Sequence, residues 1–337
     1  MHDVSIMKIF RPAVPLSTLV AGLLLVSAAA SAEENRLSMI VQNDLFVGRD
    51  GGGYTSGIAL SHMRSTAPGE TSIEVPGILS AVAPLLGVGA ATLSTTSIAQ
   101  MMATPKDITR KIPDPNDVPY VAALWVDIGQ VSVREDVADM FSLKLGALGP
   151  AAGGRRTQTF IHRIINADRP QGWDTQGPNR LLVGVERYRA WRFAADGADD
   201  TRPSADAIVL TGLTLGSWQS GLGGSVLVRY GTGLKRSYPT ALRQGLRSGD
   251  PVVLGNGWFV YAGVHGDRIF SHAGIGSKRY AQESTAELRQ AQSVVVAGIA
   301  YGFKQAALSF SLQSASPLTT SINSRHPYGS LTLTVPW

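Results

Sequence analysis

The chain has 337 residues, a formal net charge of +5 and no cysteine. The lack of cysteine excludes disulfide bonds, cysteine nucleophiles and zinc sites built on thiolates. The basic residues are scattered and match no nucleic-acid-binding module, so we expect no nucleic-acid partner. The length suits one large domain or two ordinary ones.

The first 32 residues have the pattern of a cleaved signal peptide. Lys8 and Arg11 precede an apolar run over residues 14–26, and Ala30-Ser31-Ala32 provides an A-x-A cleavage site. A transmembrane anchor would need about 20 apolar residues, and this run is shorter. We therefore expect residues 1–32 to be removed on export and residues 33–337 to form the mature domain.

Beyond the signal region, apolar and polar residues alternate along many segments. In L-T-L-T-V-P-W, Leu331 and Leu333 share one face, and Thr332 and Thr334 share the other. A period of two predicts strands with one apolar and one polar face. Such strands are predicted over 37–44 and 331–337 and over Tyr54–Met63, Thr92–Met101, Val118–Val131, Met140–Gly146, Leu181–Phe193, Ala207–Gly216, Gly224–Tyr230, Gly257–Val264, Ser293–Tyr301 and Lys304–Ser314.

These strands number about twelve, and their polar faces help to decide between two all-β folds. A soluble sandwich would bury the apolar faces in its core. In a transmembrane antiparallel barrel the apolar faces meet lipid and the polar faces line the interior. The sheet must also close, because lipid cannot pair exposed backbone groups. For an exported chain that ends on an aromatic residue, the pattern favours the barrel over residues 33–337.

Two segments interrupt the strand pattern. Ser80–Ala91 is apolar and rich in glycine, and we expect a loop or a short helix near the membrane interface. In the segment 153–173, Phe160, Ile161, Ile164 and Ile165 recur at helical spacing, with glycines before them and a proline after them. This spacing predicts a loop helix of about 12 residues.

The predicted helix and an early strand end carry polar residues that suit catalysis. Gln158 and His162 are four residues apart and therefore share a helix face. The first strand ends on Asn43-Asp44, and Thr55 follows at the start of the next. Taken singly, each of these residues also has a purely structural interpretation. An Asn-Asp pair often forms a turn, and a histidine on a surface helix often has no function.

The ordered motifs resemble those of the outer-membrane lipid A 3′-O-deacylase family. They are Q-N-D-L-F, Y-T-S-G, G-P-A-A-G-G, Q-T-F-I-H-R-I-I-N-A-D and G-W-D-T-Q, and they cover the first half of the mature chain. The resemblance implies a twelve-stranded outer-membrane barrel, a site between the wall and the loop helix, and Ca²⁺ as cofactor. It places the functional positions of the family on Asn43, Asp44, Thr55, Gln158, His162, Asp168, Arg110 and Lys111.

Two of these positions depart from the family pattern. Asp168 stands where a longer Glu can occur, and Arg110 stands where a Lys can occur. The first change would move a carboxylate back by about one methylene. The second replaces a compact ammonium group with a planar guanidinium group. Both changes bear on substrate preference.

The residue types suit ester hydrolysis with an activated water. No G-x-S-x-G motif is present, which disfavours a serine hydrolase of that type. His162 suits a general base, and Gln158 would orient it or hold the substrate. Asp44 suits a Ca²⁺ ligand, with Asn43, Thr55 or backbone carbonyls to complete the shell. Asp168 is either a second metal ligand or a partner of His162. Arg110 and Lys111 would bind a phosphate of lipid A or the oxyanion.

We therefore expect an outer-membrane hydrolase that removes the ester-linked 3′ acyl group of lipid A. Its partners would be lipopolysaccharide as substrate and the surrounding outer-membrane lipids, and the chain would be a monomer. Two alternatives stay open. One is an esterase or phospholipase that acts on another envelope lipid, and the other is a non-catalytic barrel that serves as a pore or a structural protein.

Overall fold

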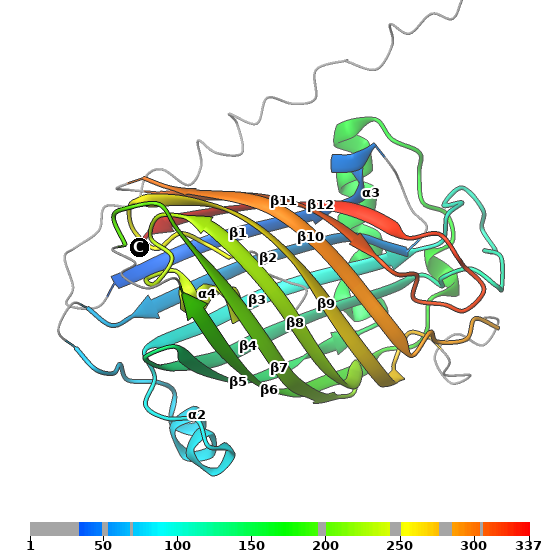
Figure 1. Ribbon diagram of the computed structural model, residues 1–337. Helices are drawn as coiled ribbons and strands as arrows, with labels where there is room; N and C mark the ends of the chain where they lie inside the picture. Colours follow the sequence, from blue (N-terminus) through cyan, green and yellow to red (C-terminus); the bar gives the residue numbers. More distant parts are fainter. Residues whose placement is uncertain are drawn as a thin grey trace, which may run out of the picture.

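The described part of the chain forms one closed antiparallel barrel. The computed structural model describes residues 34–48, 53–67, 70–194, 200–242, 251–275, 285–303 and 306–337. Each strand pairs with its sequence neighbours, and the first strand also pairs with the last (Figure 1). The strands are β1 Glu34–Asn43, β2 Gly53–Ser65, β3 Leu93–Thr104, β4 Val121–Arg134, β5 Val137–Leu148, β6 Arg180–Ala194, β7 Ser204–Gly216, β8 Gln219–Gly231, β9 Gly257–His272, β10 Ala291–Gly302, β11 Ala307–Ala315 and β12 His326–Pro336. The predicted fold is thereby confirmed.

The two faces of the wall follow the predicted alternation. Across the pair that closes the barrel, Ser38 lies opposite Thr334, and their hydroxyl oxygens are 2.6 Å apart in the interior. Leu331 and Leu333 of β12 are less buried than Thr332 and Thr334, which are fully shielded. Closure therefore buries hydroxyl groups that hydrogen-bond to one another and leaves the apolar side chains outside.

Several strands are longer than the sequence pattern predicts. β8 begins at Gln219 rather than Gly224, and β9 continues to His272 beyond the predicted end at Val264. Gly223, in the unpredicted part of β8, lies close to His265 and Asp267. Interior residues of a barrel are often polar or glycine, so they show little periodic hydrophobicity. Lys304, at the predicted start of β11, and the predicted signal peptide 1–32 lie outside the described residues.

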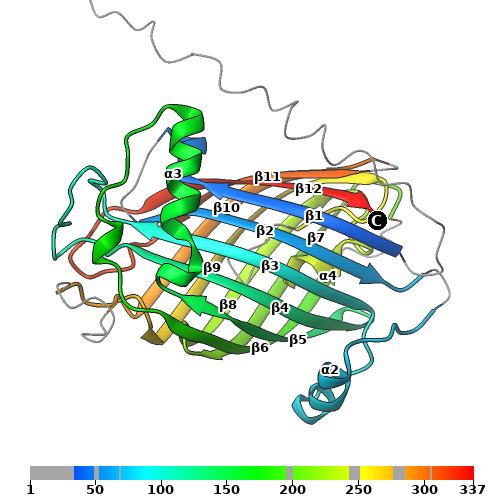
Figure 2. The ribbon, with the colours of Figure 1, turned by 180° about the vertical axis from the view of Figure 1, so that it is seen from behind.

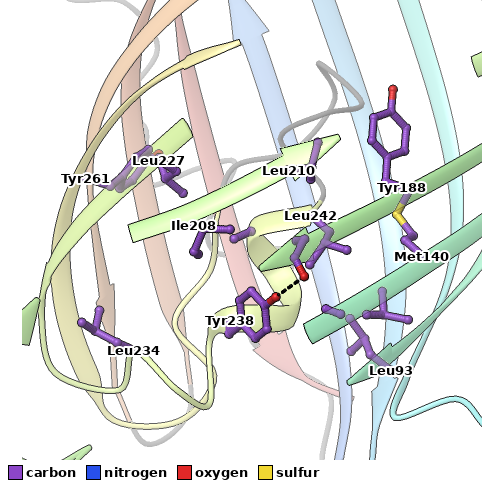
Figure 3. Packing of buried hydrophobic residues seen from close by; sticks show 14 of the residues in the cluster. Leu93, Met140, Tyr188, Ile208, Leu210, Leu227, Leu234, Tyr238, Leu242 and Tyr261 are labelled. Atoms are coloured by element: carbon purple, nitrogen blue, oxygen red, sulfur yellow. Dashed lines mark hydrogen bonds between the residues drawn. The ribbon is translucent and has the colours of Figure 1, made fainter. Parts of the chain in front are cut away.

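One end of the interior, next to the C-terminus, is filled by described residues of the connection between β8 and β9. Its short helix α4 (Tyr238–Ala241) folds into the barrel, where Tyr238 and Leu242 pack against Ile208 and Leu210 of the wall (Figure 3). The Tyr238 hydroxyl donates to the Ala190 carbonyl oxygen at 2.9 Å. Burial raises the pKa of Tyr238, so the phenol stays a donor. We call this cluster the plug.

The apolar segment between β2 and β3 forms a short hairpin outside the wall. It consists of α2 (Gly77–Val82) and the 3-10 helix η2 (Ala83–Leu86), so the helix begins before the predicted Ser80. Leu79 and Ala83 pack on Phe141 of β5, whereas Leu85 is exposed. Among the described residues, no helix combines the length and the apolar character needed to cross a bilayer.

Candidate active site

Five of the eight predicted site residues, Asn43, Asp44, Thr55, Gln158 and His162, meet at the barrel end opposite the plug. The helix α3 (Gly154–Ile165), in the connection between β5 and β6, lies against the wall at this end (Figure 2). A small cavity separates the helix from the ends of β1, β2 and β3. The cavity is lined by Asn43, Asp44, Leu45, Thr55, Ser56, Met102, Gln158, Ile161 and His162.

The end of β1 delivers Asp44 to this cavity. Asn43 is the last residue of β1, and its side-chain oxygen accepts a hydrogen bond from the Leu45 amide at 2.7 Å. This contact caps the 3-10 helix η1 (Asp44–Val47) and satisfies one of its first amide groups. Phe46 then packs over Gly329 of β12, where a larger residue would clash with the ring. The turn holds the Asp44 side chain fully buried.

A β-bulge in β2 supplies the hydroxyl groups of the cavity. The register of β2 against β3 shifts between Tyr54 and Ser56. Tyr54 and Gly57 line the interior of the barrel, whereas Thr55 and Ser56 both line the cavity. The extra residue of a bulge interrupts the strict alternation of side chains, so two consecutive hydroxyls face the same side. Thr55 Oγ1 is also 2.7 Å from the hydroxyl oxygen of Thr104.

The helix α3 turns Gln158 and His162 towards the wall, and its outward side carries apolar residues together with Arg155, Arg156 and Arg163. Gln158 and His162 are 2% and 4% exposed, whereas Phe160 is 62% exposed and Ile164 48%. A water-facing helix of a soluble protein has the opposite arrangement. Gly154 permits the close approach, because a side chain there would clash with Ala122 of β4. The exposed apolar face is therefore suited to lipid.

Trp173 fixes the orientation of the Gln158 amide. Its indole nitrogen donates to Gln158 Oε1 at 2.7 Å, and an indole N–H can only donate. The amide oxygen must therefore face Trp173, and Nε2 must point away from it. Gln158 Nε2 is buried, and it has no hydrogen-bond partner among the residues that the structure describes. A buried donor of this kind is suited to an acceptor on a bound molecule.

The backbone after α3 fixes the tautomer of His162. Its Nδ1 lies 2.6 Å from the carbonyl oxygen of Asp168. A carbonyl can only accept, so Nδ1 carries the proton and Nε2 keeps its lone pair in the neutral ring. The chain reaches this position because Asn166 ends the helix with a left-handed backbone, at φ 56°. The sequence predicts Asp168 as either a metal ligand or a partner of His162. In the structure it contacts His162, and the contact is made by its backbone carbonyl and not by its carboxylate.

Three of the predicted side chains do not line the cavity. The Asp168 side chain is exposed, as are those of Arg110 and Lys111 in the connection between β3 and β4. That connection is attached to the site, because Tyr120 at its end packs against Trp173 with ring centroids 4.9 Å apart and the ring planes inclined at 54°. Hydrogen bonds from Thr109, and to a smaller extent Arg110, hold the pKa of Asp107 below its usual range.

Sequence reasoning missed two residues at the site. Ser56 lines the cavity because of the bulge, which no local motif announces. His326, the first residue of β12, lies next to the cavity on its interior side. Its Nε2 donates to the Tyr54 carbonyl oxygen at 2.9 Å and lies 3.9 Å from Asp44 Oδ2. The H-P-Y sequence around it carries no catalytic signature.

The described residues around the cavity offer few charged groups to a metal ion. Within the described ranges, no group of three or more His, Asp or Glu side chains could hold a metal. Asp44, Asn43 and Thr55 each carry a side-chain oxygen atom, the ligand type that Ca²⁺ prefers. The residues therefore fit a calcium site with one carboxylate, in which neutral oxygen atoms supply the other ligands.

The chain matches one protein family and several solved outer-membrane structures. The family model for outer membrane protein LpxR matches residues 16–337. Among solved structures, LpxR from Salmonella typhimurium is 19% identical with a TM-score of 0.71, and the match covers 90% of this chain and 100% of that chain. The translocator domain of autotransporter NalP from Neisseria meningitidis is 10% identical with a TM-score of 0.41, covering 96% and 93% of the two chains. No curated protein matches.

The likeness to the Salmonella protein shows a shared fold and nothing more, because only 19% of the aligned residues are identical. The family match is broader, since it extends over nearly the whole sequence and includes every residue of the candidate site. The chain therefore belongs to the LpxR family of outer-membrane proteins.

Proposed function

We propose that this protein is a carboxylic ester hydrolase that removes the 3′ acyloxyacyl group from lipid A. The family match supports an outer-membrane enzyme that modifies lipid A. The observation that carries the proposal is the inverted amphipathicity of α3. Gln158 and His162 face a buried acidic cavity, whereas Phe160 and Ile164 are exposed on the outside of the same helix.

His162 acts as the general base in this proposal. Its Nδ1–H is held by the Asp168 carbonyl, so the Nε2 lone pair is the basic position. A water molecule that donates to Nε2 would lose a proton as it attacks the ester carbonyl. The His162 ring would then return that proton to the leaving sugar oxygen, which completes hydrolysis to an acid and an alcohol.

Gln158 is proposed as a donor to the oxyanion. As the carbonyl becomes tetrahedral, negative charge develops on its oxygen, and fixed N–H groups stabilise that charge. Gln158 Nε2 is buried, and Trp173 holds it in one orientation. An amide that is fixed before the reaction costs no reorganisation when the charge appears.

Asp44, with Asn43 and Thr55, would hold Ca²⁺. When bound, the ion supplies positive charge that polarises an ester carbonyl. A site with one carboxylate binds Ca²⁺ weakly, because affinity rises with the number of charged ligands. Arg110 and Lys111 are proposed to recognise a phosphate of lipid A from the exposed connection between β3 and β4.

Mass spectrometry of lipid A tests the proposal. Lipid A would be extracted from bacteria that express the wild-type chain and from matched cells that express His162→Ala. We expect the mass of the 3′ acyloxyacyl group to be lost only with the wild type. Folded wild-type protein that leaves purified lipid A intact in the presence of Ca²⁺ would contradict the proposal.

The same assay distinguishes this proposal from an esterase of another envelope lipid and from a non-catalytic barrel. Acyl release from purified phospholipid but not from lipid A would assign the site to another envelope lipid. A non-catalytic barrel predicts that neither substrate changes and that His162→Ala has no phenotype. Size measurement of the purified protein in detergent would check the expected monomer.

A further inference from the structure

His326 lies at the junction of three parts of the site that are far apart in the sequence. It begins β12, the strand that closes the barrel against β1. The residue is 9% exposed, and its ring lies next to Gly53, the first residue of β2. Gly53 has a φ of +144°, a conformation that other residues adopt with strain. The backbone of β2 therefore passes close to the imidazole.

The first contact of His326 is with the β-bulge. Its Nε2–H donates to the carbonyl oxygen of Tyr54 at 2.9 Å. Tyr54 is the residue at which the register of β2 against β3 shifts. A bulge disturbs the regular ladder, and a buried backbone carbonyl needs a partner. The imidazole thus secures the backbone that directs Thr55 and Ser56 into the cavity.

The second contact of His326 is with the carboxylate of the site. The same nitrogen lies 3.9 Å from Asp44 Oδ2. Asp44 is fully buried, so the nearby polar N–H group favours its negative charge across this distance, although the two groups are too far apart for a hydrogen bond. One imidazole therefore touches both the turn after β1 and the bulge in β2, and these elements supply all of the oxygen donors proposed for Ca²⁺.

We propose that His326 is a positioning residue that holds Asp44 and the bulge of β2 in register for catalysis. It does not touch the substrate, because it lies on the interior side of the wall, whereas Gln158 and His162 lie on the outer side. The inference rests on the proposed hydrolysis. It adds a residue from the opposite end of the sequence to the machinery of the site.

Three variants of His326 separate hydrogen bonding from packing. His326→Phe keeps a ring of similar shape and removes the donor. His326→Gln keeps an N–H that can reach the Tyr54 carbonyl, and His326→Ala removes both features. His62→Ala is the matched control, because His62 lies towards the other end of β2, where it contacts Asn35. Folding of each barrel is checked by circular dichroism and thermal unfolding.

Acyl release from lipid A is then measured for each folded protein at several Ca²⁺ concentrations. We expect His326→Phe and His326→Ala to lower kcat by roughly 10- to 100-fold, with little change in KM, as is typical when a residue that orients metal ligands is lost. We expect His326→Gln to recover most of kcat. His62→Ala should match the wild type.

A second readout does not depend on activity. The increase in Tm on addition of Ca²⁺ is titrated, and its midpoint should move to higher Ca²⁺ in His326→Phe but not in His326→Gln. The proposal is overturned if His326→Phe keeps the wild-type kcat and calcium midpoint, whether or not His326→Ala folds. Equal losses in His326→Phe and His326→Gln would also overturn it. If the wild type itself releases no acyl group, the hydrolase function fails instead.

Discussion

The two ends of the barrel use their buried polar groups differently. At the plug, Tyr238 donates to the backbone oxygens of Ala190 and Asp136, and Leu242 and other apolar side chains surround it. At the candidate site, the fully buried carboxylate of Asp44 and the amide of Gln158 line one cavity, and Gln158 Nε2 has no hydrogen-bond partner among the described residues. The Tyr238 hydroxyl is paired within the protein, whereas the Gln158 amide can donate to a bound molecule.

This difference indicates how the molecule divides stability from function. Apolar burial contributes about 25 cal/mol per Å², so the plug supports the folded state. Buried polar groups without a permanent partner cost stability, and they are kept where they serve a ligand. Substitutions at the candidate site should therefore lower activity with little change in stability, whereas substitutions in the plug should lower stability with little change in activity.

Asp44→Ala should have the largest effect on activity. Among the described residues that line the cavity, Asp44 carries the one carboxylate, so the substitution takes away the charged ligand of the proposed calcium site. We expect acyl release to fall below detection, while the barrel still assembles and its Tm stays close to that of the wild type. Chelation of Ca²⁺ should give the same loss in the wild type, and added Ca²⁺ should reverse it. Activity that survives exhaustive chelation would exclude the metal.

His162→Ala should lower kcat by about 10²- to 10⁴-fold, the range expected for loss of a general base. The reason is that His162 Nε2 is the basic position directed at the cavity. Rates of acyl release from purified lipid A provide the measurement, with unchanged thermal unfolding as the control. If more than a tenth of the activity remained, the proton acceptor would have to be another group.

Gln158→Ala should lower kcat by about 10²- to 10³-fold, as is found for loss of a donor to an oxyanion. Trp173→Phe is the graded comparison, because it keeps the ring and removes only the N–H that orients the amide. We expect a smaller loss, about tenfold, for that variant. A Trp173→Phe enzyme as inactive as Gln158→Ala would show that the indole acts through packing with Tyr120 instead.

Leu242→Ala in the plug should have the smallest effect on activity and a clear effect on stability. Truncation of a fully buried leucine costs about 2–5 kcal/mol of unfolding free energy. We expect a lower Tm in detergent and acyl release within about twofold of the wild type below that temperature. A large loss of activity in the folded variant would mean that the two ends of the barrel are coupled.

Much of the fold could be predicted because lipid imposes a simple pattern on the strands. Leu331 and Leu333 alternate with Thr332 and Thr334, and the structure confirms both faces. The length of β8 could not be predicted, since interior glycines such as Gly223 leave no side chain to mark the face. The helical spacing of Gln158 and His162 did predict their common face on α3.

The parts of the site that escaped prediction depend on contacts across the sequence. His326 and Tyr54 are 272 positions apart, and they meet only because β12 pairs with β1. Asp168 contributes a backbone carbonyl to His162, and every residue type offers that group. Side-chain chemistry alone therefore could not distinguish its two proposed roles.

The exposed face of α3 also bears on how a substrate arrives. Phe160, Ile164 and Ile165 are exposed on the same helix that carries His162, so in the proposed function an amphiphilic substrate would approach by lateral diffusion within its leaflet. Extraction of a twelve-carbon chain into water would cost roughly 10 kcal/mol at about 0.8 kcal/mol per methylene. A two-dimensional approach avoids that barrier, and turnover should then depend on the fluidity of the surrounding acyl chains.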